Sequence, residues 1–285
     1  MDTPVNKFAE KTAIGIITCN RPEFVNKLID SIDESVGAIY LIDSSDTKTK
    51  INSSHKLKEH IYLDTKPTPV GRAKNRALRE MRHSGYDYLF LIEDDVVIKN
   101  NSVFQVYIET AAESGLWAGQ LSYGGHGGKA GGNIKKDGTP NIIELVEYDT
   151  KSVALYPQSF QAFALYHANI FKLIGYLDDY YVNAVEHLDH YYLAFLRGLG
   201  NYFWYFPDIE NSWDYIEDID SEHSDSVIRK DPEWNNNVQL ALAWFRKKYS
   251  FIPTGIPKAN REKVMERLKF LEDSYSRKDL LKSEG

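Results

Sequence analysis

Short, almost wholly apolar runs recur along the first hundred residues, and each of them is followed by polar residues. The longest are 13–19 (AIGIITC), 38–42 (AIYLI) and 88–92 (YLFLI), with a shorter run at 61–63. Continuous apolar runs of this length are typical of strands buried on both faces, as in parallel sheets. We therefore predict four strands, with 88–92 at the centre of the sheet.

Helical patterns separate these strands. Phe24, Leu28 and Ile32 recur every four residues after Pro22, which suits the first turn of a helix, and 71–83 begins a second helix. The resulting order of strands and helices predicts an α/β fold with a mostly parallel, doubly wound (Rossmann-like) sheet.

Polar side chains stand at the carboxyl ends of the predicted strands, where sheets of this kind bind ligands. They are Thr18, Asn20, Asp43 and the triplet Glu93-Asp94-Asp95. Three adjacent carboxylates repel one another and raise one another's pKa unless a cation lies among them. A hard divalent ion, which also binds phosphate, is the simplest such cation. A solvated acidic strand end is the alternative, but the convergence of several polar strand ends favours a site.

The second half of the chain is less regular. We expect helices over 102–114, 170–175, 182–200, 233–248 and 259–282, and strands over 160–166 and 201–206. The segment 124–132 contains six glycines and predicts a loop, either a lid or a plain surface excursion. It is no Walker site, because it lacks GK[ST] after a strand.

The predicted helix over 182–200 has an apolar face and a charged one. The apolar face comprises Leu188, Tyr192, Phe195 and Leu199. Glu186, His190 and Arg197 lie opposite, with Asp189 beside Glu186. By itself, a charged helix face is typical of a solvated surface.

Composition narrows the class of protein. The 285 residues, 42% of them hydrophobic, suffice for one large domain with or without an appendage. The net charge of −7 does not indicate a general electrostatic attraction to nucleic acid. Cys19 is the one cysteine, and no apolar signal segment or eighteen-residue apolar run occurs. These features predict a cytoplasmic protein. The helix over 259–282 would dock on the domain, pair with another subunit or touch a membrane surface as a peripheral contact.

Several motifs, in order, resemble those of a known family. The motifs that carry the resemblance are ITCNRPEFVNKLIDSI, the strand ending in Asp43, GRAKNRAL and the acidic triplet. The chain resembles nucleotide-sugar glycosyltransferases of the A-type (GT-A) fold, in particular inverting glycosyltransferase family 2. The resemblance implies a catalytic domain over 1–232, with a nucleotide-sugar half at about 13–100 and an acceptor half at about 101–232. A C-terminal helical extension would follow over 233–285.

The resemblance also implies roles for individual residues. Asp43 would contact the base or ribose, Arg72 and Asn75 would lie over the nucleoside, Glu93 or Asp94 would approach the ribose, and Asp95 would hold Mn²⁺ or Mg²⁺ in a DxD-like motif. Thr18, Asn20 and Arg21 complete the expected donor site. In the family a downstream histidine often completes the metal shell, and His223 is the candidate here, with an ordinary loop histidine as the alternative.

A second signature concerns the base. IGYLDDYYVNAVEHLDHYYLAFLRGLG resembles the family segment in which an acid at a helix start deprotonates the acceptor hydroxyl. Glu186 matches the base and Asp189 the second acid. His187 stands where many members carry Asp, so either Glu186 or Asp189 would take the proton.

The predicted function is metal-dependent transfer of a sugar, with inversion, from a nucleotide diphosphate sugar (UDP first) to an acceptor hydroxyl. A glycan, a lipid-linked sugar, a protein side chain and a hydroxylated DNA base are compatible acceptors, and nucleic acid enters only in that role. A nucleotidyltransferase of similar fold is one alternative, although TCNRPEF lacks the glycine-rich basic loop usual there. A non-catalytic carbohydrate-binding protein is the other.

Overall fold

A six-stranded sheet forms the centre of the protein in the computed structural model, which describes residues 7–33, 35–64, 68–124, 132–159, 161–220 and 226–281. Its strands, in spatial order, are β3 (Glu59–Tyr62), β2 (Ala38–Asp43), β1 (Thr12–Thr18), β4 (Tyr88–Glu93), β9 (Phe163–His167) and β6 (Ala118–Ser122). The first four are mutually parallel, whereas β9 runs antiparallel to β4 and to β6. The predicted mostly parallel α/β sheet is confirmed.

Register brings the polar strand ends together. Thr18 lies opposite Asp43 on β2, and Ile17 lies opposite Glu93 on β4. Because these three strands are parallel, their carboxyl ends meet at one edge of the sheet.

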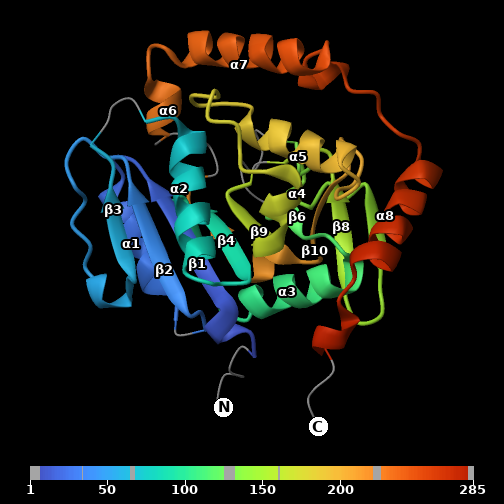
Figure 1. Ribbon diagram of the computed structural model, residues 1–285, viewed down its shortest axis with the longest axis horizontal. Coiled ribbons are helices and arrows are strands. Elements are labelled where there is room, and N and C mark those ends of the chain that lie inside the picture. Colours follow the sequence, from blue (N-terminus) through green and yellow to red (C-terminus); the bar gives the residue numbers. More distant parts are fainter. Residues whose placement is uncertain are drawn as a thin grey trace.

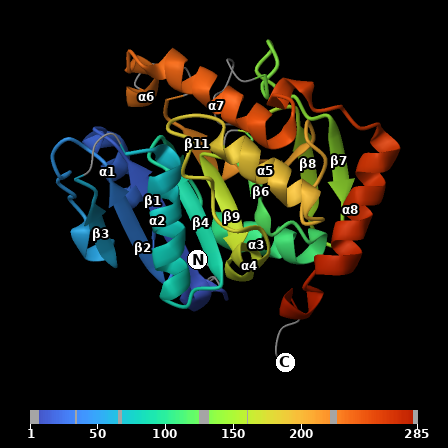
Figure 2. The same cartoon turned by 45° about the horizontal axis from the view of Figure 1, so that its top comes forward.

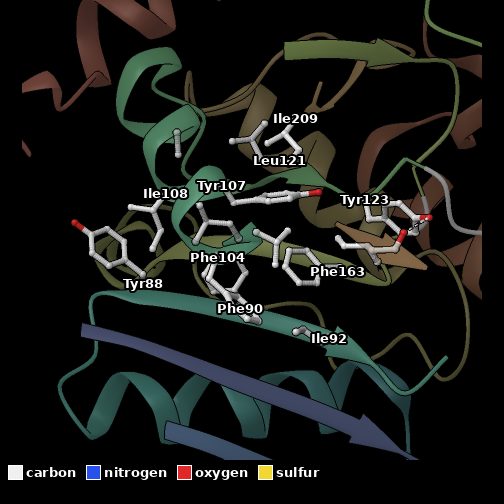
Figure 3. Packing of buried hydrophobic residues seen from close by; sticks show 14 of the residues in the cluster. Tyr88, Phe90, Ile92, Phe104, Tyr107, Ile108, Leu121, Tyr123, Phe163 and Ile209 are labelled. Atoms are coloured by element: carbon white, nitrogen blue, oxygen red, sulfur yellow. Dashed lines mark hydrogen bonds between the residues drawn. The ribbon is translucent and has the colours of Figure 1, made fainter. Parts of the chain in front are cut away.

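Helices cover both faces of the sheet (Figure 1). Residues of β1 alternate between the two faces: Ile14 and Ile16 belong to one buried cluster, and Ala13 and Ile17 to the other. The first cluster includes side chains of α1 (Pro22–Ser31) and α3 (Val103–Ser114). The second includes the apolar stripe of α2 (Val70–His83). Figure 3 shows how rings from β4, α3 and β9, such as Phe90, Phe104 and Phe163, interlock on the α3 side.

Two small sheets flank the main one. An antiparallel sheet contains β7 (Glu144–Glu147), β8 (Ser152–Tyr156) and β10 (Phe206–Ile209). The expected strand over 201–206 is wrong: the side-chain amide of Asn201 donates to the Tyr205 carbonyl and closes a turn, so pairing begins only at Phe206. The second apolar run after the acids leaves the main sheet, because β5 (Val96–Ile98) pairs with β11 (Ile216–Asp218).

The remaining described helices follow in the second half of the chain. They are α4 (Phe171–Ile174), α5 (Glu186–Leu196), α6 (Val227–Lys230), α7 (Trp234–Tyr249) and α8 (Arg261–Tyr275), besides 3-10 turns at Ala9–Lys11, Ser54–Lys56, Ala168–Ile170, Ser212–Asp214, Pro253–Gly255 and Lys278–Leu281. Figures 1 and 2 show α7 crossing beside α5, with α8 running down one side. Val264, Leu268 and Leu271 of α8 are buried in the main core, as docking requires. In the described ranges, no helix is long and apolar enough to cross a membrane.

Candidate active site

A cavity of about 740 Å³ opens at the carboxyl ends of β1 and β4. One wall consists of the strand ends (17–21 and 93–95) together with Ser44 and Asp46. The start of α5 (183–187) and Lys74 of α2 belong to the lining as well. Residues 226–232 and Trp234, around α6 and the start of α7, contribute a further wall, so the lining crosses the predicted domain boundary at residue 232.

A guanidinium lies among the strand-end carboxylates. Arg21 donates to Asp94, to Asp95 at 3.2 Å and to Asp220 at 3.4 Å, and Thr18 donates to Asp94 at 2.6 Å. Asp94 and Asp95 are 1% and 5% exposed. Burial raises the pKa of Asp94 above its ordinary value, although the positive charge of Arg21 opposes the shift. The cation that the acidic triplet requires is therefore supplied here by the chain itself.

The chemistry of these side chains also suits a divalent ion. Oδ1 of Asp95 is buried and has no hydrogen-bond partner among the described residues, and an orphaned carboxylate oxygen is a natural ligand for Mn²⁺ or Mg²⁺. The same part of the chain contains no group of three or more His, Cys, Asp and Glu side chains arranged to hold a metal. His223, the predicted additional ligand, lies outside the described residues, as do residues 125–131 of the glycine-rich segment.

Glu186, at the first position of α5, is 3% exposed and lines the cavity. Its Oε1 accepts from Lys74 Nζ at 2.9 Å and lies 3.5 Å from Nδ1 of His187. Burial by itself would raise the pKa of Glu186, but the Lys74 ammonium and His187 outweigh it and hold the pKa well below its usual range. Glu186 is therefore ionised at neutral pH.

The charged face of α5 is buried rather than solvated. Glu186, Asp189 and His190 are all at most 3% exposed, and of the charged set only Arg197 faces solvent. Asp189 accepts from Tyr181 Oη at 3.1 Å and from Lys248 Nζ of α7 at 2.7 Å, and it does not line the cavity. The geometry thus separates the two candidate acids: Glu186 faces the cavity, and Asp189 holds α7.

Three other predicted donor residues also lie outside the cavity lining. Asp43 is fully buried and accepts from the Ser45 and Thr49 amides and from His60, and these hydrogen bonds hold its pKa below the ordinary value although burial opposes them. Asn75 bonds both backbone groups of Leu177. Arg72 is exposed on α2.

Asp43 instead shapes a loop that reaches the cavity. The loop presents Asp46, which exchanges two hydrogen bonds with Asn20 at 2.9 Å each. Thr18, Asn20, Arg21, Glu93, Asp94 and Asp95 all line the cavity, so these predicted residues do come together. Their individual roles stay predictions.

Sequence reasoning missed Lys74, Asp46, Asp220 and Trp234. For Lys74 a signal existed. It stands three, four and seven residues before Ala77, Leu78 and Met81, so a single lysine interrupts the apolar stripe of α2. A charged residue within an apolar stripe indicates either a helix end or a buried ion pair.

No protein-family model matches the chain, and no curated protein matches it. Among solved structures, it is similar to the mannosyltransferase PcManGT from Pyrobaculum calidifontis in complex with GDP-Man and Mn²⁺, at 10% identity and a TM-score of 0.50 over 99% of this chain and 78% of that one. It is also similar to S. aureus TarS, at 16% identity and a TM-score of 0.48 over 95% of this chain and 50% of that one. The chain thus spans half the length of that TarS structure.

The sheet of this chain combines the parallel strands β3, β2, β1 and β4 with the antiparallel strands β9 and β6. At such low identity the likeness concerns the fold alone. Together with the topology it identifies the architecture of this chain as the A-type fold of nucleotide-sugar glycosyltransferases.

Proposed function

We propose that this protein transfers a sugar from a nucleoside diphosphate sugar to an acceptor hydroxyl with inversion, and that a UDP sugar is the first donor to test. The observation that carries the proposal is that two charged groups line one cavity. One is the Arg21–Asp94–Asp95 cluster at the strand ends, and the other is the buried carboxylate of Glu186. The likeness to a mannosyltransferase in complex with GDP-Man and Mn²⁺ supports the class of donor.

The donor side would stabilise the leaving group. A nucleoside diphosphate departs with developing negative charge on its phosphate oxygens, and Arg21, which lines the cavity, supplies a fixed positive charge there. When bound, a divalent ion would add Lewis-acid stabilisation of the same charge. Asp95 would hold that ion through its orphaned Oδ1, with His223 as the predicted further ligand.

The acceptor side would activate the nucleophile. The acceptor oxygen bonds to the anomeric carbon as the bond from that carbon to the diphosphate oxygen breaks, and the hydroxyl proton passes to Glu186. Such general-base assistance contributes about 10²–10⁴-fold to the rate. Glu186 is a better candidate than Asp189, because Lys248 and Tyr181 already occupy the Asp189 carboxylate outside the cavity.

Thermal unfolding with UDP-GlcNAc, UDP-glucose or GDP-mannose, each with and without Mn²⁺, tests the proposal. A ligand that binds only the native state stabilises it by about 2.7 kcal/mol at a concentration of 100 Kd. We expect one of the nucleotide sugars to raise the Tm, and Mn²⁺ to enlarge the shift.

Asp95→Asn should abolish the part that depends on Mn²⁺. Asp87→Asn, at the other end of β4 and 44% exposed, is the matched control and should keep it. Absence of a shift with every nucleotide sugar would refute the proposal. Pyrophosphate release from a nucleoside triphosphate would favour a nucleotidyltransferase instead.

A further inference from the structure

A buried lysine joins two carboxylates of the cavity lining. Nζ of Lys74 lies 2.8 Å from Oε1 of Glu93, at the end of β4, and 2.9 Å from Oε1 of Glu186, at the start of α5. Lys74 is 1% exposed, and all three residues line the cavity. One ammonium therefore connects the predicted donor side with the predicted base.

Hydrogen bonds between α2 and the segment before α5 hold this lysine in place. The amide of Val70, at the start of α2, donates to the carbonyl of Val182 at 2.7 Å. Asn75 bonds both the carbonyl and the amide of Leu177, at 2.7 and 2.9 Å. The turn of α2 that carries Lys74 is thus tied to the segment that leads into Glu186. Groups held by such contacts keep their relative position without rearrangement during a reaction.

The hydrogen bonds on Glu186 are unequal. Lys74 and His187 both approach Oε1, whereas Oε2 is buried and has no hydrogen-bond partner among the described residues. The large majority of buried polar atoms have a hydrogen-bond partner, so an unpartnered carboxylate oxygen requires an explanation. Because Glu186 is a lining residue, the unpartnered oxygen of its side chain could accept a hydrogen bond from a ligand in the cavity, and a sugar hydroxyl is such a donor.

We propose that Lys74 is a positioning residue for the transfer reaction: it holds Glu186 by Oε1, so that Oε2 is the atom that receives the acceptor proton, and it ties this base to Glu93 on the donor side. The inference rests on the proposed function. It assigns no contact with substrate to Lys74, which acts through Glu186.

Turnover of UDP-GlcNAc with Mn²⁺ and water as the acceptor, measured as UDP release, provides the first test. In Lys74→Met we expect kcat to fall by about 10²-fold, the scale of general-base assistance, with KM for UDP-GlcNAc within about threefold of wild type. Arg76→Met, which removes an exposed cation from the same helix, should leave both unchanged. A folded Lys74→Met protein with wild-type kcat, or with a change in KM alone, would overturn the proposal.

Lys74→Arg covers the case in which the methionine variant does not fold. It keeps the positive charge, but its longer planar head places Glu186 differently, so we expect an intermediate kcat at unchanged KM. Wild-type kcat in Lys74→Arg would show that the position of Glu186 is immaterial and would overturn the inference.

Crystal structures separate this inference from the proposed function. In wild type with UDP, Glu186 should remain bonded to Lys74 through one oxygen, and in Lys74→Met or Lys74→Arg its carboxylate should turn. If the carboxylate of Glu186 keeps its wild-type orientation in these variants, the inference is wrong, irrespective of their activity. If the wild-type protein neither binds nor turns over any nucleotide sugar, the proposed function is wrong instead. The orientation of Glu186 in the variants still tests the role of Lys74.

Discussion

Replacement of Arg21 by methionine should destabilise the protein strongly, because three buried carboxylates would lose their shared cation. The side chains of Asp94, Asp95 and Asp220 are 2%, 7% and 1% exposed, and Arg21 itself is 14% exposed, so water can do little to solvate the charges left behind. Removal of one partner from a buried ion pair costs about 3–5 kcal/mol.

This loss should be visible in thermal unfolding. For domains somewhat smaller than this one, each kcal/mol shifts the Tm by about 2–4 °C, so Arg21→Met should unfold about 6–20 °C below wild type in EDTA. Addition of Mn²⁺ should recover part of the difference, because a divalent ion among the same carboxylates replaces the missing charge. Wild type, which has its own guanidinium there, should gain less from the metal.

Circular dichroism during heating at pH 7, in EDTA and in Mn²⁺, gives all four Tm values. Arg261→Met is the matched control: it removes the same functional group from an ion pair with Glu144, but Arg261 is 71% exposed, and its Tm should stay near wild type. If Arg21→Met melts within about 2 °C of wild type in EDTA, burial does not make this cluster depend on its cation, and the electrostatic reasoning is wrong.

Three further predictions follow from the described contacts. Glu186→Gln should leave UDP-GlcNAc binding by calorimetry unchanged and lower turnover by about 10²–10⁴-fold, and near-normal turnover would contradict its role as base. In Lys74→Met, the charge that most strongly opposes the effect of burial is gone, so the pKa of Glu186 rises and the acid limb of the kcat–pH profile should move to higher pH; an unmoved limb would mean that another group sets it. Gly15→Ala should lower stability by about 1–3 kcal/mol in urea unfolding, since the new Cβ would lie 2.6 Å from Cβ of Ala77, and an unchanged midpoint would refute this packing of α2 on β1.

The central sheet could be predicted because its signals are local. The apolar runs at 13–19, 38–42 and 88–92 became β1, β2 and β4, since a strand buried on both faces needs apolar side chains at nearly every position. The position of Thr18 and the acids at the strand ends then followed from the parallel arrangement. The prediction over 201–206 failed because aromatic residues there suit a turn over the core as well as a strand, and only the pairing partner distinguishes them.

The sequence alone determined that polar side chains of β1 and β4 would meet at one edge of an α/β sheet. Only the tertiary structure decided which charges are buried there. Lys74 and Glu186 are 112 residues apart, and Asp189 depends on Lys248 of a different helix. The helical pattern predicts that charged side chains face water. This prediction fails where a remote segment supplies an opposite charge, because the two charged side chains can then be buried as a pair.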